Sequence, residues 1–168
     1  VLNSTTYQLS HIPRSEHPQA EATFAHYLLR PLEAEVLIDA LCQITGTTEQ
    51  YFSPIPEPFA FIPESQRSIA LADGSITSSF LTMFGRSSRS TGMEAERVNE
   101  LGSTQWLHML NSAAIQNKLQ SGPKLNALLS SGGKTSEIAE RLYLTVLSRF
   151  PTDADLKTVE EEAKTGVT

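Results

Sequence analysis

The chain has 168 residues, of which 39% are hydrophobic and 19% charged, as in globular domains and unlike disordered chains. Its formal net charge is −6: residues 1–84 hold 3 Lys/Arg and 9 Asp/Glu, whereas residues 85–168 hold 10 of each. No basic surface is expected, which excludes nucleic acid as a partner. No apolar run approaches ~20 residues, so membrane insertion is not expected either.

The first fifty residues predict two helices. Residues 19–29 place apolar side chains on one helical face, after two prolines have interrupted the preceding polar segment. A second helix is predicted from Leu32, because Pro31 suits a first helical position and Gly46 is a natural stop. Its apolar positions follow helical spacing: Val36, Leu37, Ala40, Leu41 and Ile44.

Residues 51–74 predict a long loop rich in proline and aromatic residues. Prolines at four positions exclude a helix and favour extended backbone. The aromatic side chains between them either fasten the loop to a helical core or form a recognition surface. Residues 68–71 could form a short strand before the turn at Asp73 and Gly74.

The second half of the chain predicts further helices. A helix over residues 76–84 should end at Gly85, and a helix over residues 103–119 should turn Trp106 and Leu110 inward. After the Gly122-Pro123 break, a short helix should reach Leu129.

The last two predicted helices lie on either side of Pro151. One covers residues 136–149, and the other is capped by Thr152 and Asp155. The predicted fold is therefore all-α, with about five to seven helices packed as one irregular bundle with a long Pro/aromatic loop (51–74). We expect a single helical domain over residues 1–168.

A charged loop follows Gly85 and offers the candidate site. Its three arginines and two glutamates could form internal pairs, with Arg97 reaching Glu94 or Glu100 one turn away. The alternative is a site for a carboxylate, sulfate or phosphate group. The candidate ligand-binding residues are Arg86, Arg89, Glu96, Arg97, Gln105 and His108.

Catalytic and metal signatures are missing from the sequence. Glu94 and Glu96 would point to opposite sides of a helix, and no acidic residue is spaced to orient His108 as a base. The four histidines and Cys42 make no metal pattern, and a single cysteine excludes an internal disulfide. We therefore predict no catalytic residue, no metal and no cofactor. Enzymatic activity stays open, with a non-enzyme favoured.

Five segments, in this order, resemble a bacterial family of planctomycete type, the domain of unknown function fifteen fifty-three or PSD-one domain. They are NSTTYQLS, RPLEAEVLIDALCQITG, FLTMFGRSSR, ERVNELGSTQWLHMLNS and RLYLTVLSRFPTDADL. The resemblance implies a fragment of a multidomain protein that is periplasmic or secreted, with upstream domains of the same polypeptide as partners. It supplies no activity and no catalytic residues.

One departure from the family pattern bears on chemistry. Many relatives carry C-x-C before a Glu-Arg pair, whereas this chain has Met93 and Ala95 before Glu96 and Arg97. A role for such a cysteine pair is therefore absent from this chain.

Two functions remain as hypotheses. The first is a non-catalytic helical binding or scaffold domain of an exported multidomain bacterial protein. The alternative is a carbohydrate-active or anionic-polysaccharide-binding domain that uses the loop between Arg86 and Arg97. A docking role toward an upstream haem module is a further hypothesis, although the chain has no C-x-x-C-H motif to attach haem itself.

Overall fold

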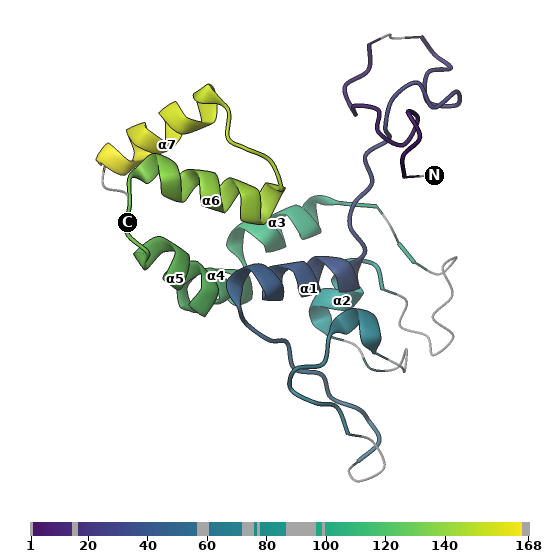
Figure 1. Ribbon diagram of the computed structural model, residues 1–168. Coiled ribbons are helices and arrows are strands. Elements are labelled where there is room, and N and C mark those ends of the chain that lie inside the picture. Colours follow the sequence, from purple (N-terminus) through teal and green to yellow (C-terminus); the bar gives the residue numbers. More distant parts are fainter. Residues whose placement is uncertain are drawn as a thin grey trace. The chain divides into compact units, whose positions relative to one another are not determined.

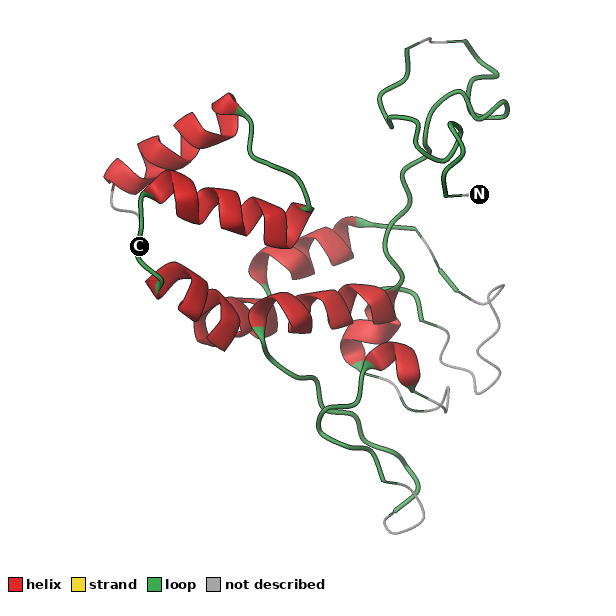
Figure 2. Ribbon diagram, viewed as in Figure 1, coloured by secondary structure: helices red, strands yellow, loops and turns green. Residues whose placement is uncertain are grey.

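The computed structural model of the protein describes residues 2–14, 17–56, 61–71, 76, 78–86, 97–98 and 100–165. These described residues form seven α-helices, one 3₁₀ helix and no strand, which confirms the predicted all-α fold (Figures 1 and 2). In chain order the elements are α1 (Ala34–Thr45), η1 (Ser68–Ala70), α2 (Ser79–Met83), α3 (Ser103–Asn111), α4 (Ala113–Ser121), α5 (Pro123–Ser130), α6 (Thr135–Leu147) and α7 (Asp153–Thr165).

The chain divides into two compact units, Val1–Leu32 and Glu33–Thr168, and each is described by itself. The expectation of one domain over the whole chain stays a prediction. The first unit forms turns in place of the helix predicted over residues 19–29. Phe24 there has a φ of 53°, and a left-handed residue ends a helical turn, so the turn that precedes it does not continue.

Helix α1 is the central element of the second unit, because η1, α2, α4 and α5 all pack against it. It confirms the helix predicted between Pro31 and Gly46, and Gly46 ends it with a φ of 78°. Its buried side chains join residues from the rest of the unit in one core: Ala34, Ile38, Tyr51, Ile76, Phe80, Leu81, Phe84 and Ile115.

Helix α2 is shorter than the helix predicted over residues 76–84, but Gly85 terminates it as expected, just after the C-cap residue Phe84. Gly85 has a φ of +91°. The N–H of Arg86 reaches the carbonyl of Leu81 at 2.9 Å, and the N–H of Gly85 reaches that of Thr82 at 3.2 Å. These two bonds define a Schellman motif. The motif fixes the direction in which Arg86 leaves the helix.

The described part of the Pro/aromatic segment is a loop with one helical turn, η1, where residues 68–71 were expected to form a strand. Asp39 on α1 explains the difference. Its carboxylate accepts the N–H of Ser68 at 2.7 Å and that of Ile69 at 3.2 Å. Such a cap satisfies the N–H groups that a helical turn leaves unpaired at its start. The tertiary contact therefore selects a helical turn over a strand.

The aromatic residues of this segment have two different environments. Tyr51 is buried in the core, and its hydroxyl is hydrogen-bonded to the hydroxyl of Ser68. Burial raises the pKa of Tyr51 to about 12, so its hydroxyl stays neutral at physiological pH. Phe52 and Phe61 are exposed. The loop is thus fastened to the core by Tyr51 and leaves two aromatic rings in solvent.

The single helix predicted over residues 103–119 is two helices, α3 and α4, which meet at Ser112. Ser112 has extended backbone (φ −68°, ψ 127°) and occupies the N-cap position of α4, a position that serine favours. The break changes which side chains face the core. Ile115 is buried, whereas Trp106 and Leu110 are exposed, so the prediction that they face inward was wrong.

Two lysines hold α4 and α5 against the C-terminal end of α1. Nζ of Lys118 donates to the carbonyl of Thr48 at 3.1 Å, and Nζ of Lys124 donates to that of Gln43 at 3.0 Å. Between the lysines, a Cβ on Gly122 would lie 2.8 Å from the carbonyl oxygen of Thr45 on α1. Only glycine permits this close approach of the backbones.

Helices α6 and α7 pack on each other, and α6 also contacts α5. They confirm the two helices predicted on either side of Pro151. The carboxylate of Asp155 accepts the backbone N–H of Thr152 at 2.9 Å, the hydroxyl of Thr152 at 2.9 Å and Nη1 of Arg149 at 3.0 Å. These bonds confirm the predicted cap and lower the pKa of Asp155 to about 2.

Replacing Gly85 by alanine should destabilise the fold more than the same change at Gly132. Both glycines have positive φ, which costs an alanine about 1–2 kcal/mol. At Gly85 the added Cβ would also lie 1.9 Å from the carbonyl oxygen of Val98, whereas at Gly132 nothing lies within 4 Å. We expect urea unfolding to show a loss of about 3 kcal/mol or more for G85A and about 1 kcal/mol for G132A. Equal losses would show that Val98 does not close over Gly85.

Candidate functional site

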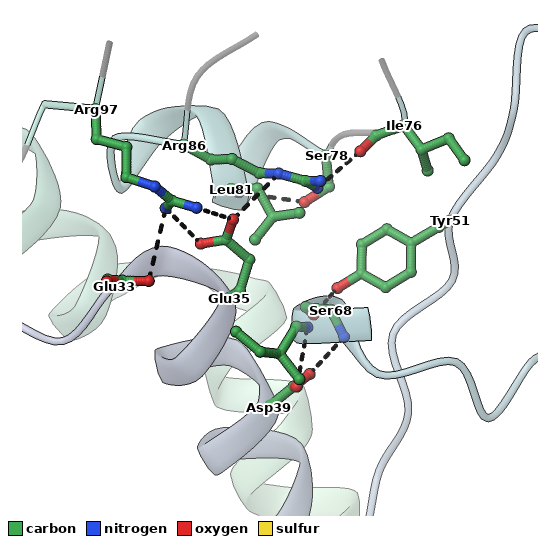
Figure 3. Close-up of polar contacts among 11 residues, drawn as sticks. Glu33, Glu35, Asp39, Tyr51, Ser68, Ile76, Ser78, Leu81, Arg86 and Arg97 are labelled. Atoms are coloured by element: carbon green, nitrogen blue, oxygen red, sulfur yellow. Dashed lines mark hydrogen bonds and ion pairs between the residues drawn. The ribbon is translucent and has the colours of Figure 1, made fainter. Parts of the chain in front are cut away.

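The candidate site is a cluster of ion pairs at the N-terminal end of α1, formed by Glu35, Arg86 and Arg97 (Figure 3). Arg97 holds the Glu35 carboxylate with both terminal nitrogens, Nη1 to Oε2 and Nη2 to Oε1, each at 2.8 Å. Nε of Arg86 lies 3.2 Å from the same Oε1. One carboxylate is therefore shared by two guanidinium groups.

The cluster is largely removed from solvent. The exposed fraction of the side chain is 5% for Glu35, 8% for Arg86 and 16% for Arg97. A fourth charge completes it, because Oε2 of Glu33 lies 3.9 Å from Nη1 of Arg97. Two carboxylates thus balance two guanidinium groups. Such pairing is what makes the burial of charge tolerable.

Two helix ends and one backbone hydrogen bond place the three central side chains. Glu35 lies in the first turn of α1, where the helix dipole favours a negative charge. Arg86 follows the Schellman motif of α2, and its Nη1 also donates to the carbonyl of Ile76 at 2.8 Å. The N–H of Val98 donates to the carbonyl of Gly85 at 3.1 Å, which brings Arg97 alongside Arg86.

The electrostatics of the cluster keep Glu35 ionised. Burial acts to raise the pKa of this carboxyl group. The hydrogen bonds from Arg97, the backbone N–H of Glu35 itself and the positive charges of Arg97 and Arg86 outweigh burial, so the pKa lies below its ordinary value of 4.5. The ion pairs are therefore intact throughout the neutral range.

Gln105 connects α3 to α2. Its Nε2 donates to the carbonyl of Met83 at 2.9 Å, and its Oε1 accepts the N–H of Gly102 at 2.9 Å. The first bond satisfies a carbonyl at the C-terminal end of α2, and the second satisfies an N–H at the start of α3. Nε2 of Gln105 thus joins α3 to α2, and its Oε1 caps the start of α3.

His108 packs its ring against the rings of Phe80 and Phe84, with centroid distances of 5.8 and 6.0 Å. Its Nε2 is buried and has no hydrogen-bond partner among the described residues. The described surroundings offer His108 no carboxylate that would orient it as a general base.

The four predicted site residues within the described structure make three separate sets of contacts. Arg86 and Arg97 meet on Glu35, Gln105 joins α2 to α3, and His108 packs on phenylalanine rings. Arg89 and Glu96 lie outside the described residues, as does Glu94. A ligand-binding role for the six residues stays a prediction.

Sequence reasoning missed Glu35, the residue on which the arginines converge. Helical spacing predicts Glu94 or Glu100 as the partner of Arg97, whereas the structure pairs Arg97 with a carboxylate 62 positions away. A signal was present, because Glu35 falls on the same helical stripe as Ile38 and Thr45, both of which are buried. An acidic residue on a buried stripe requires a cation, and the charged loop supplies one.

The arrangement can fix the fold by joining segments that are distant in sequence. The position that an external anion would take between the two arginines is filled by the protein's own carboxylate, which Arg97 holds bidentately. An external anion at Arg86 and Arg97 would have to displace Glu35, which is buried and hydrogen-bonded.

The described ranges hold neither a cluster of metal ligands nor a membrane-spanning helix. In these ranges no three His, Cys, Asp or Glu side chains lie close enough together to hold a metal ion. None of the helices described combines the length and the apolar character that a membrane span requires.

Comparison with known proteins gives a family but no described function. Residues 1–163 match the model of a family described as PSD1, protein of unknown function (DUF1553). No curated protein and no solved structure matches the chain.

Replacing Glu35 by glutamine should lower the free energy of unfolding by about 3–5 kcal/mol, because two guanidinium groups lose the carboxylate that they share. Glu33→Gln is the matched control. The side chain of Glu33 is 45% exposed and lies 3.9 Å from Arg97, so this change should cost less than about 1 kcal/mol. Urea unfolding at pH 7 measures both. Similar small losses would mean that water already separates the ions of the cluster.

The contribution of Glu35 should also depend on pH in a defined direction. Its pKa is lowered by folding, so its stabilising effect is complete above the unfolded-state pKa and is lost as pH falls through the folded-state pKa. We expect the stability difference between wild type and E35Q to be largest near neutral pH and to shrink below about 4.5. Urea unfolding at a series of pH values tests this, and a difference that stays constant would contradict it.

Proposed function

This chain belongs to the family of DUF1553 proteins of unknown function. From that premise we propose that it is a non-catalytic helical binding or scaffold domain of an exported, multidomain bacterial protein. The partner in this proposal is the upstream part of the same polypeptide, in the periplasm or outside the cell.

The observation that carries the proposal is an apolar cluster on the surface of α3. Trp106, Leu107 and Leu110 are 59%, 58% and 68% exposed. Leu110 follows Trp106 by four positions and Leu107 by three, and both spacings make neighbours on a helix, so Leu110 joins the other two side chains in one surface. Exposed apolar clusters of this kind mark interaction sites, and tryptophan is prominent among the residues that dominate binding energy.

A second exposed apolar cluster lies at the C-terminal end of α6. Val146 and Leu147 are about half exposed, and Phe150, just beyond the helix, is more so. The second unit thus exposes large apolar side chains and buries charged ones. This distribution favours a role in binding another protein surface. The charges of the Glu35 cluster pair with one another and are not available to a partner.

The alternative function, carbohydrate activity or binding of an anionic polysaccharide, gains support from one observation. The exposed ring of Trp106 is the kind of aromatic surface on which a sugar can stack. The loop proposed to bind the anionic groups is less favourable, because Arg86 and Arg97 hold Glu35. Since Trp106 is the only tryptophan, its fluorescence reports stacking directly. A shift on adding polyuronate but not dextran would favour the alternative.

A lysine at position 110 tests the scaffold proposal. The rest of the natural polypeptide, expressed separately, should bind this chain in isothermal titration, and Leu110→Lys should abolish binding because it places a charge in the apolar cluster. The matched control is Ile55→Lys, at a half-exposed apolar position outside the cluster, which should bind as the wild type does. Absence of binding by the wild type, or full binding by L110K, would contradict the proposal.

A further inference from the structure

We propose that a cavity lined by Arg67 and Lys124, beside the C-terminal half of α1, binds a compact oxyanion: the carboxylate, sulfate or phosphate group of a small polar ligand. The cavity has a volume of about 560 Å³, which is within the usual range for small-molecule sites. It is separate from the Glu35 cluster and from the apolar cluster of α3. The proposal therefore goes beyond the scaffold role and does not depend on it.

The two cations contact residues of α1 that lie one helical turn apart. Nε of Arg67 lies 3.3 Å from Oδ2 of Asp39, and Nζ of Lys124 lies 3.0 Å from the carbonyl oxygen of Gln43. Asp39 and Gln43 are four residues apart, so they are neighbours on one face of the helix, about 5–6 Å from each other. An anion seated over that face can meet both cations at once.

Both cations keep donors for a ligand. Nε of Arg67 lies 3.3 Å from Oδ2 of Asp39, and within the described structure no hydrogen bond engages its two terminal nitrogens. The side chain of Arg67 is 69% exposed. Lys124 has three N–H donors and uses one of them on a carbonyl. A guanidinium fork with free terminal nitrogens suits a carboxylate, sulfate or phosphate group, because it binds two oxygens together.

The carboxylates that line the cavity are already neutralised. Asp39 accepts two backbone N–H groups of η1 in addition to its pair with Arg67. Oε2 of Glu49 lies 3.1 Å from Nζ of Lys118. With Lys118 included, three cations face two carboxylates, and the local formal charge is +1. An anion entering the cavity therefore meets no unpaired carboxylate from these residues.

The remaining wall suits a polar ligand of monosaccharide size. Thr48, Ser65 and Gln66 line the cavity and offer hydroxyl and amide groups. Such groups can bond the neutral hydroxyls of a ligand whose anionic group is held by the cations. Arg86 is buried and paired with Glu35, whereas Arg67 is exposed to solvent and can reach a ligand.

The test is an NMR titration of the ¹⁵N-labelled chain with sodium sulfate and with sodium glucuronate. Sodium chloride at equal ionic strength and glucose serve as reference solutes. We expect saturable shifts of the amides of Gly46, Thr48 and Gln66. Affinity should fall about tenfold or more in Arg67→Gln combined with Lys124→Gln, because two charge-assisted contacts are lost. Arg141→Gln combined with Lys157→Gln removes the same charge from α6 and α7, and it should bind as the wild type does.

A second variant distinguishes loss of the binding site from loss of the fold in the first variant. Ser65→Asp keeps both cations and adds a carboxylate to the cavity wall, so it should also weaken binding. Equal affinity for sulfate and glucuronate would support recognition of the oxyanion alone, and tighter glucuronate binding would support a sugar acid as the ligand. Shifts no larger than those with chloride would overturn the proposal, as would binding that survives in either variant.

Discussion

The buried carboxylate of Glu35 is the constraint on which the second unit depends. A charge in the interior is tolerated only when it is paired and hydrogen-bonded, and Glu35 is served by Arg86 and Arg97 together. To reach it, the chain must reverse sharply at Gly85 and return at Val98. The Schellman motif and the bond between Gly85 and Val98 provide this path. The pairing thus connects the start of α1 with the end of α2 and with residues beyond the charged loop.

The same logic recurs along α1. Asp39 satisfies the open N–H groups of η1, and the last turn of the helix receives Lys124 on the carbonyl of Gln43. Carboxylates toward the N-terminal end and a cation at the C-terminal end agree with the helix dipole. Helix α1 therefore organises the unit by polar contacts as well as by its apolar face. Arg67 pairs with Asp39 at the surface through Nε, and its terminal nitrogens can donate to a ligand.

The distribution of side chains supports the proposed binding role. Its central charges are engaged inside the protein, whereas large apolar side chains lie outside on α3 and at the end of α6. Trp106 shows how this arises. The break at Ser112 turns α4 so that Ile115 enters the core, while Gln105 and His108 hold the opposite face of α3 against α2. Trp106 and Leu110 are then left on the open side.

The sequence by itself determined where several of the helices end. Gly46, Gly85 and the Thr152-Asp155 cap each set a helix end, because capping acts between residues at most about five positions apart. The all-α class followed from these signals and from helical periodicity. Only the tertiary structure decided the partner of the arginines and which apolar side chains are covered. An ion pair across 62 positions depends on topology, and an amphipathic pattern does not say what packs against it.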